Sequence, residues 1–128
     1  MNLEAFIARE AAQPFAYGSH DCATTADKWV KEVTGFSPMA RFGRVYTKQI
    51  EAEEWLSEPG SLAVAINRVM RKCGLKKTGK PRKGDVGLIV WKDKVFVAIH
   101  AGDGWFSRAP DGLIIAPLTA WRKAWRIA

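Results

Sequence analysis

Apolar residues recur at helical spacing, i, i+3 and i+4, through the first half of the chain. Three such stretches each follow a residue type that caps helices, so we expect helices there. A Gly or a Pro closes each stretch, as is usual where a helix ends. The predicted helices begin near Asn2, Asp21 and Ser61, and a weaker pattern runs from Thr47 to Gly60.

From Asp85 onward the pattern changes to short runs rich in β-branched and aromatic residues. Turn residues separate the runs: Lys92-Asp93-Lys94 indicates a hairpin, and Gly102-Asp103-Gly104 and Pro110-Asp111-Gly112 indicate two further turns. We therefore expect several short antiparallel strands. Their ranges are 86–91, 95–101, 105–109 and 113–116, with a last strand in 121–127.

Helices followed by an antiparallel meander are the pattern of an α+β domain. We predict a single domain over residues 1–128, with a helical half at about 1–75 packed on a barrel-like β half at about 84–128. A basic connector over residues 76–84 joins the two halves. Its composition fits both a solvated linker and a contact with a polyanion.

Composition excludes several classes of protein. Apolar residues make up 48% of the chain, too many for a disordered protein, and no apolar run is long enough to span a bilayer. The N-terminus lacks the layout of a signal peptide. The net charge of +7 is compatible with an anionic partner, but no nucleic-acid-binding motif is present. Neither a metal-ligand spacing nor a phosphate loop occurs, so we expect no cofactor and no metal.

The two cysteines stand in different contexts. Cys73 falls at the expected end of a helix, where a packing role fits best. Cys22 directly follows Asp21, the expected N-cap, and so lies on the first turn of a helix. Unpaired N–H groups and the helix dipole favour a thiolate there, and the thiolate is the nucleophilic form of cysteine. A nucleophile and a buried structural cysteine both fit this placement.

The Asp21-Cys22 pair resembles the helix start of the NlpC/P60 cysteine peptidases, a papain-like superfamily that cleaves peptidoglycan stem peptides. Residues 81–86 and 97–102 are similar to two core strands of those enzymes. A closer resemblance is to the DUF6950-type proteins, which phages and prophages encode near tail genes. It covers nearly the whole chain through an ordered set of motifs: residues 17–22, Gly35, residues 41–47, Gly84-Asp85-Val86, Asp111-Gly112-Leu113 and Ala124-Trp125-Arg126.

The resemblance implies a papain-like fold with Cys22 as the nucleophile and Asp21 supporting the helix start. It also implies a gap in the catalytic set. In NlpC/P60 enzymes a His precedes the Val-Gly-Ile step and a polar residue on the next strand completes the set. Phe96 and Arg108 occupy these two positions. A phenyl ring cannot accept a proton, and an Arg side chain is always protonated.

Two histidines are substitute candidates for the general base. His100 has the strand parity of Phe96 but lies four residues further on, about 13 Å along an extended strand. His20 precedes Cys22 by two residues, in the loop that enters the helix. Either side chain could serve as a base, or it could have a packing role only.

Two functions are therefore expected from the resemblance. The first is a structural or assembly role at a phage tail tip, with tail hub or tip proteins as partners and one or several copies in the assembly. Such a protein would reside in the virion, or in the host cytoplasm during assembly. The second is an active peptidoglycan-degrading cysteine peptidase or amidase that uses Cys22 during DNA entry. A nucleic-acid adaptor acting through the basic connector has the least support.

Overall fold

The computed structural model describes residues 2–42 and 61–127, where helices come first and strands second. The predicted α+β class is confirmed, whereas the pattern from Thr47 to Gly60 lies outside the described residues. The helices are α1 (Leu3–Ala11), α2 (Cys22–Thr34), α3 (Pro38–Phe42) and α5 (Ser61–Lys72). The strands are β1 (Val86–Trp91), β2 (Lys94–His100), β3 (Trp105–Ala109), β4 (Gly112–Ala116) and β5 (Trp121–Trp125), with a short 3-10 helix, η1 (Leu118–Ala120), before β5.

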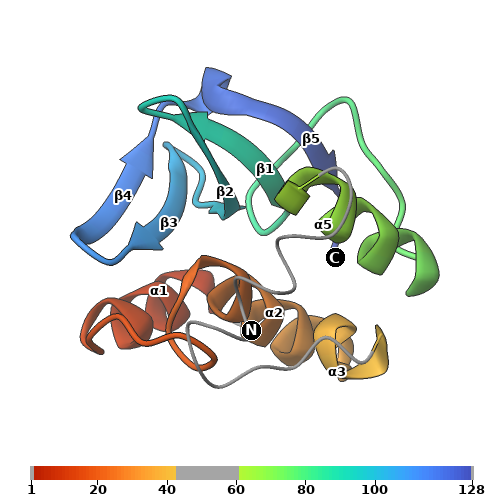
Figure 1. Cartoon of the computed structure of the whole chain (residues 1–128), viewed down its shortest axis with the longest axis horizontal. Helices are drawn as coiled ribbons and strands as arrows, with labels where there is room; N and C mark the ends of the chain where they lie inside the picture. Colours follow the sequence, from red (N-terminus) through yellow and green to blue (C-terminus); the bar gives the residue numbers. More distant parts are fainter. Residues whose placement is uncertain (1, 43–60, 128) are drawn as a thin grey trace.

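The described strands form one antiparallel sheet in the order β4-β3-β2-β1-β5. Strands β1 to β4 make the predicted meander, while β5 returns across the sheet to pair with β1. Figure 1 shows α1, α2 and α3 together on one side of this sheet, with α5 beside the end formed by β1 and β5. The helical half therefore covers one face of the β half, as the sequence predicts.

Each face of the sheet carries a buried core. The first face packs on the helices in the larger core, where Phe6, Trp29 and Val30 of the helices meet the sheet. The second face encloses a smaller core to which every strand contributes, so the sheet must curve around it. This double burial explains why β1 is almost continuously apolar instead of alternating. The smaller core contains Ile89, Ala98, Trp105, Ala109, Ile114, Ala116 and Ala124.

The ends of α2 follow the local signals in the sequence. The Asp21 carboxylate accepts a hydrogen bond from the N–H of Thr24 at 2.8 Å, and the Thr24 hydroxyl accepts one from the N–H of Asp21 at 3.0 Å. This reciprocal pair is a capping box. Gly35 ends the helix in the left-handed region, at φ 87°. Both predicted helix ends are confirmed.

The hairpin between β1 and β2 is also confirmed. Trp91 pairs with Lys94, so Lys92 and Asp93 are its two turn residues. Both have a left-handed backbone, at φ 50° and 64°. This is the geometry of a type I′ turn, whose twist matches that of the strands it joins.

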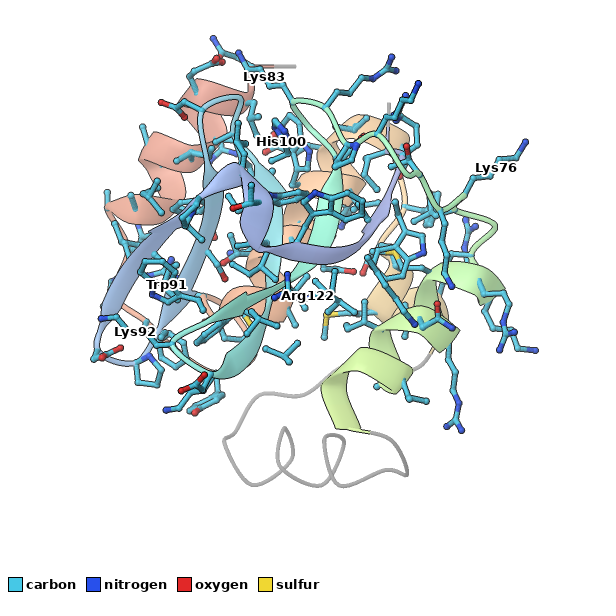
Figure 2. All side chains as sticks on the ribbon, turned by 90° about the horizontal axis from the view of Figure 1, so that it is seen from above. Lys76, Lys83, Trp91, Lys92, His100 and Arg122 are labelled. Atoms are coloured by element: carbon cyan, nitrogen blue, oxygen red, sulfur yellow. The ribbon has the colours of Figure 1, made fainter. Side chains whose placement is uncertain are left out.

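The basic connector is bound to the C-terminal strand rather than free. The N–H of Thr78 donates to the carbonyl of Ala124 at 2.9 Å. The buried carboxylate of Asp85, just before β1, accepts a hydrogen bond from Nε of Arg126 at 3.1 Å. Lys83 pairs with Glu4 of α1. Figure 2 shows Lys76 extending away from the protein, so the connector combines fixed backbone with exposed cations.

The first testable prediction concerns Gly87, which lies where β1 passes over Trp105. A Cβ atom at Gly87 would lie 2.8 Å from two atoms of the Trp105 ring and 3.0 Å from the carbonyl oxygen of Lys123. We expect Gly87→Ala to lower the free energy of unfolding by about 1–3 kcal/mol, because the buried ring has no room to move. Urea denaturation measures the change.

Gly79→Ala is the matched control for this substitution. A Cβ atom at Gly79 would have no neighbour within 4 Å, so we expect a change within about 0.5 kcal/mol. Equal losses of stability in the two variants would contradict the packing argument.

Candidate functional site around Cys22

Cys22 is the first residue of α2, directly after its N-cap Asp21. Its side chain packs against the larger core. The backbone N–H of Val97 in β2 forms a hydrogen bond with the Cys22 sulfur. The carbonyl of Val97 accepts a hydrogen bond from the hydroxyl of Ser107 in β3, at 2.7 Å. Two side chains therefore occupy the hydrogen-bonding groups of Val97.

This arrangement follows from the way β2 and β3 diverge. Their pairing is limited to Ile99 with Phe106 and His100 with Trp105, next to the turn that joins them. Beyond that point the backbone groups of β2 that face β3 need other partners. The thiol of Cys22 is one of these partners, because it forms a hydrogen bond with the backbone of Val97.

Burial raises the pKa of the Cys22 thiol from 9.0 to about 11. Backbone hydrogen bonds from Val97 and Ala23 act in the opposite direction, whereas the charge of Asp21 raises the pKa further. Burial therefore outweighs the favourable effect of the helix start on a thiolate. Near neutral pH Cys22 is a protonated thiol, which is the less reactive form.

His100 ends β2, three residues beyond Val97. Side chains alternate along a strand, so His100 lies on the opposite face of β2 from Val97. Its Nδ1 accepts a hydrogen bond from the N–H of Gly102 at 3.1 Å, and its ring packs edge-on against Trp105. Burial lowers the pKa of His100. The structure thus places this imidazole in contacts on the far side of the strand from Cys22.

His20 belongs to a polar cluster between α1 and α2, which we call the Glu10 cluster; it consists of Glu10, His20, Thr25 and Lys28. Nδ1 of His20 lies 3.3 Å from Oε1 of Glu10 and 3.1 Å from Nζ of Lys28. The Lys28 ammonium is 2.7 Å from the same carboxylate oxygen, and the Thr25 hydroxyl donates to it at 3.4 Å. The Nδ1 edge of His20 is therefore engaged by this cluster.

Glu10 is a buried acid that the sequence analysis did not single out. Burial would raise the pKa of its carboxyl group, but hydrogen bonds and charge from Lys28 and His20 outweigh burial and hold the pKa below its ordinary value. A signal for it was available. Glu10 continues the stripe of Leu3 and Phe6 on α1, and an acid on a buried stripe needs a partner.

Arg108 is the second buried charge near the site, with 3% of its surface exposed. Its guanidinium donates to the backbone carbonyls of Glu10 at 2.9 Å and Gln13 at 2.5 Å. Glu10 lies near the C-terminal end of α1, and Gln13 lies just beyond that end. Its Nε is buried and has no hydrogen-bond partner among the described residues. Arg108 therefore connects β3 to the end of α1.

Phe96 lines a groove of about 660 Å³ together with Tyr17 and Trp91. Lys92 also lines it, and Figure 2 shows Trp91 and Lys92 together at this end of the protein. The described residues around the groove do not include Cys22. The aromatic groove and the thiol are thus separate features.

Comparison with known proteins identifies the family. The family model described as a domain of unknown function, DUF6950, matches residues 1–127. The chain belongs to the DUF6950 family. No curated protein and no solved structure matches it. The closer of the two resemblances expected from the motifs is therefore confirmed at the level of the family.

Two further observations describe this DUF6950 chain. Within residues 2–42 and 61–127, no group of three or more His, Cys, Asp or Glu side chains is arranged to hold a metal ion. None of the helices in these ranges is long and apolar enough to cross a membrane.

The pKa of Cys22 gives a prediction that alkylation can test. In the Cys73→Ser variant of the DUF6950 chain, Cys22 is the sole thiol. Since its pKa is about 11, we expect the rate of iodoacetamide labelling to rise about tenfold per pH unit above neutral pH. Mass spectrometry of quenched samples gives the rate. A rate that levels off near neutral pH would instead indicate an activated thiolate.

The contact of Arg108 gives a prediction about stability. Arg108→Met removes both hydrogen bonds that tie β3 to the end of α1, and the Glu10 carbonyl keeps only its bond from the N–H of Gln13. Because the Gln13 carbonyl loses this donor and the buried cation is removed, we expect the DUF6950 chain to lose about 2–4 kcal/mol of unfolding free energy. Arg122→Met is the control, because Arg122 is exposed and contacts only neighbouring carbonyls. Chemical denaturation compares them, and equal stability of the two variants would refute a structural role for Arg108.

Proposed function

We propose that this protein is a phage or prophage tail-tip component with an NlpC/P60-like, papain-like fold and an incomplete catalytic set. Its role is structural or in assembly. The observation that carries this proposal is the contact of Arg108 with Glu10 and Gln13. In the resemblance to NlpC/P60 enzymes, Arg108 is expected where the catalytic set has a polar group that orients a base, and a buried cation bound to two backbone carbonyls does not suit that role.

The surroundings of Cys22 support the same proposal. Its thiol has a pKa of about 11 and forms a hydrogen bond with the backbone of Val97 in β2. Nδ1 of His20 is engaged by the Glu10 cluster, and His100 lies on the other face of β2. A cysteine nucleophile needs a base within hydrogen-bond reach, and these contacts use the two imidazoles for packing.

The partners in this proposal are tail hub or tip proteins, with one or several copies of the chain in the assembly. The protein would reside in the virion, and in the host cytoplasm while tails assemble. The groove lined by Tyr17, Trp91 and Phe96 offers a contact surface, because aromatic side chains are enriched where proteins associate. The net charge of +7 favours partners with acidic surfaces.

An active peptidoglycan peptidase or amidase is the second candidate, favoured by the position of Cys22 at the start of a capped helix. In that function the Cys22 sulfur attacks the amide carbonyl, and its proton passes to His20 or His100 and then to the leaving amine. The backbone N–H groups at the start of α2 would stabilise the oxyanion. This route requires a rearrangement that frees one of the imidazoles from its present contacts.

Complementation separates the two candidates. A phage from which the gene is deleted is supplied with the wild-type chain, Cys22→Ser or Cys73→Ser, the last being the matched cysteine control. We expect no tails of normal infectivity without the chain, equal titres with all three forms, and the chain among the proteins of purified tails by mass spectrometry. We also expect purified wild-type protein to release no soluble muropeptides from cell walls.

Two results would overturn these expectations in different ways. Muropeptide release by the wild-type protein but not by Cys22→Ser would establish the enzymatic candidate. Normal titres in the deletion phage, with the chain missing from purified tails, would exclude the tail role itself.

A further inference from the structure

Strand β4 is an edge strand without the usual protection. Among the described strands it pairs with β3 alone. Proteins usually protect such edges with charged residues, proline or a covering element. The sequence of β4, Gly-Leu-Ile-Ile-Ala, contains no charge and no proline, and Leu113 and Ile115 are 50% and 61% exposed. An apolar edge of this kind is a template for pairing with another strand.

The register of the sheet shows which backbone groups are open. Ala109 pairs with Gly112 across a two-residue turn, so these two residues exchange hydrogen bonds. Hydrogen-bonded and non-hydrogen-bonded residue pairs alternate along two antiparallel strands, so the N–H and C=O groups of Ile114 face β3. By the same alternation, the N–H and C=O groups of Leu113 and Ile115 point away from the sheet.

We propose that β4 pairs antiparallel with β4 of a second copy of this chain, about a two-fold axis at Ile114. In that register Leu113 of each copy lies opposite Ile115 of the other. Each opposed pair exchanges two N–H···O=C bonds, which gives four bonds across the interface. The exposed Leu and Ile side chains then face each other on the same side of the joined sheet, where such pairs stabilise antiparallel strands.

The length of β4 and the distribution of charge favour β4 of a second copy as the strand that pairs with this edge. All five residues of β4, Gly112–Ala116, overlap their counterparts when Ile114 lies on the axis, so none of the strand remains unpaired. Two chains of net charge +7 repel each other over most of their surfaces. The uncharged β4 lies at the far edge of the sheet from β5 and the basic connector (Figure 1). Copies that meet at β4 keep β5 and the basic connector of each chain apart, and the cations beside the joined edge are Lys92 and Lys94 of the groove.

This interface goes beyond the proposed tail role, since it depends on β4 alone and on no phage partner. A two-fold contact is isologous: each copy contributes the same patch, and the assembly closes as a dimer. Leu113 also lines the aromatic groove, so the dimer would bring two grooves to one continuous sheet.

Sedimentation velocity over a wide range of concentrations tests the proposal with the full chain. We expect the wild-type chain to form a dimer, and Ile115→Lys to weaken association by at least about tenfold, since it introduces two charges into the apolar pairs. Val95→Lys is the matched control: Val95 is an apolar residue with 40% exposure on β2, away from the edge. It should associate like the wild-type chain, and circular dichroism verifies that each variant is folded.

Disulfide cross-linking tests the register independently of the Lys variant. In a chain without its native cysteines, Leu113→Cys combined with Ile115→Cys should form a covalent dimer on oxidation, because opposed bonded residues have Cα atoms about 5.5 Å apart. Leu113→Cys alone should remain monomeric, since its counterpart lies two residues out of register.

Three outcomes would overturn the proposal. They are a wild-type chain that stays monomeric at all concentrations, an Ile115→Lys variant that associates as tightly as the wild-type chain, and a Leu113→Cys variant that cross-links as fast as the double variant.

Discussion

The buried guanidinium of Arg108 fixes how the helices lie on the sheet. Removing a cation from water is costly unless it is hydrogen bonded, so Arg108 must keep its two carbonyl acceptors. Those carbonyls belong to Glu10 and Gln13, at and just beyond the end of α1. The contact therefore holds α1 against β3 and determines where the loop to α2 begins. Since Cys22 follows that loop, its position depends on a charge on the opposite layer.

Glu10 extends this constraint from α1 to α2. Its backbone carbonyl accepts from Arg108, while its carboxylate contacts Lys28 and His20. One residue thus joins the sheet and both helices, and its carboxylate is paired with Lys28. The polar groups of the Glu10 cluster and Arg108 thus hold the helices and the sheet together. A change at any of them affects packing and chemistry at once, so activity measurements on such variants need a parallel measurement of folding.

Local signals in the sequence account for most of the fold. Asn2 and Asp21 cap their helices as predicted, and the turn residues separate the strands correctly. Helix α3 and the pairing of the predicted last strand escaped prediction, because both depend on distant partners. Helix α3 begins where the Asp27 carboxylate accepts from the N–H of Met39, twelve residues away. Strand β5 pairs with β1, which lies far from it in the sequence. The Arg108 contact with α1 spans 98 residues, which no local pattern can reveal.

In the candidate site, the pKa of Cys22 is likewise a property that local sequence patterns do not predict. At an exposed position, the start of a helix stabilises a negatively charged side chain by up to about 1 kcal/mol. The sequence predicts this effect, because it places Cys22 at the start of a helix. Raising the pKa from 9.0 to about 11 corresponds to about 3 kcal/mol against the thiolate, because burial between β2 and β3 removes its hydration. The larger effect depends on how the strands diverge. A base for Cys22 would have to lie within hydrogen-bond reach of its sulfur, whereas Nδ1 of His20 and Nδ1 of His100 are held in other contacts.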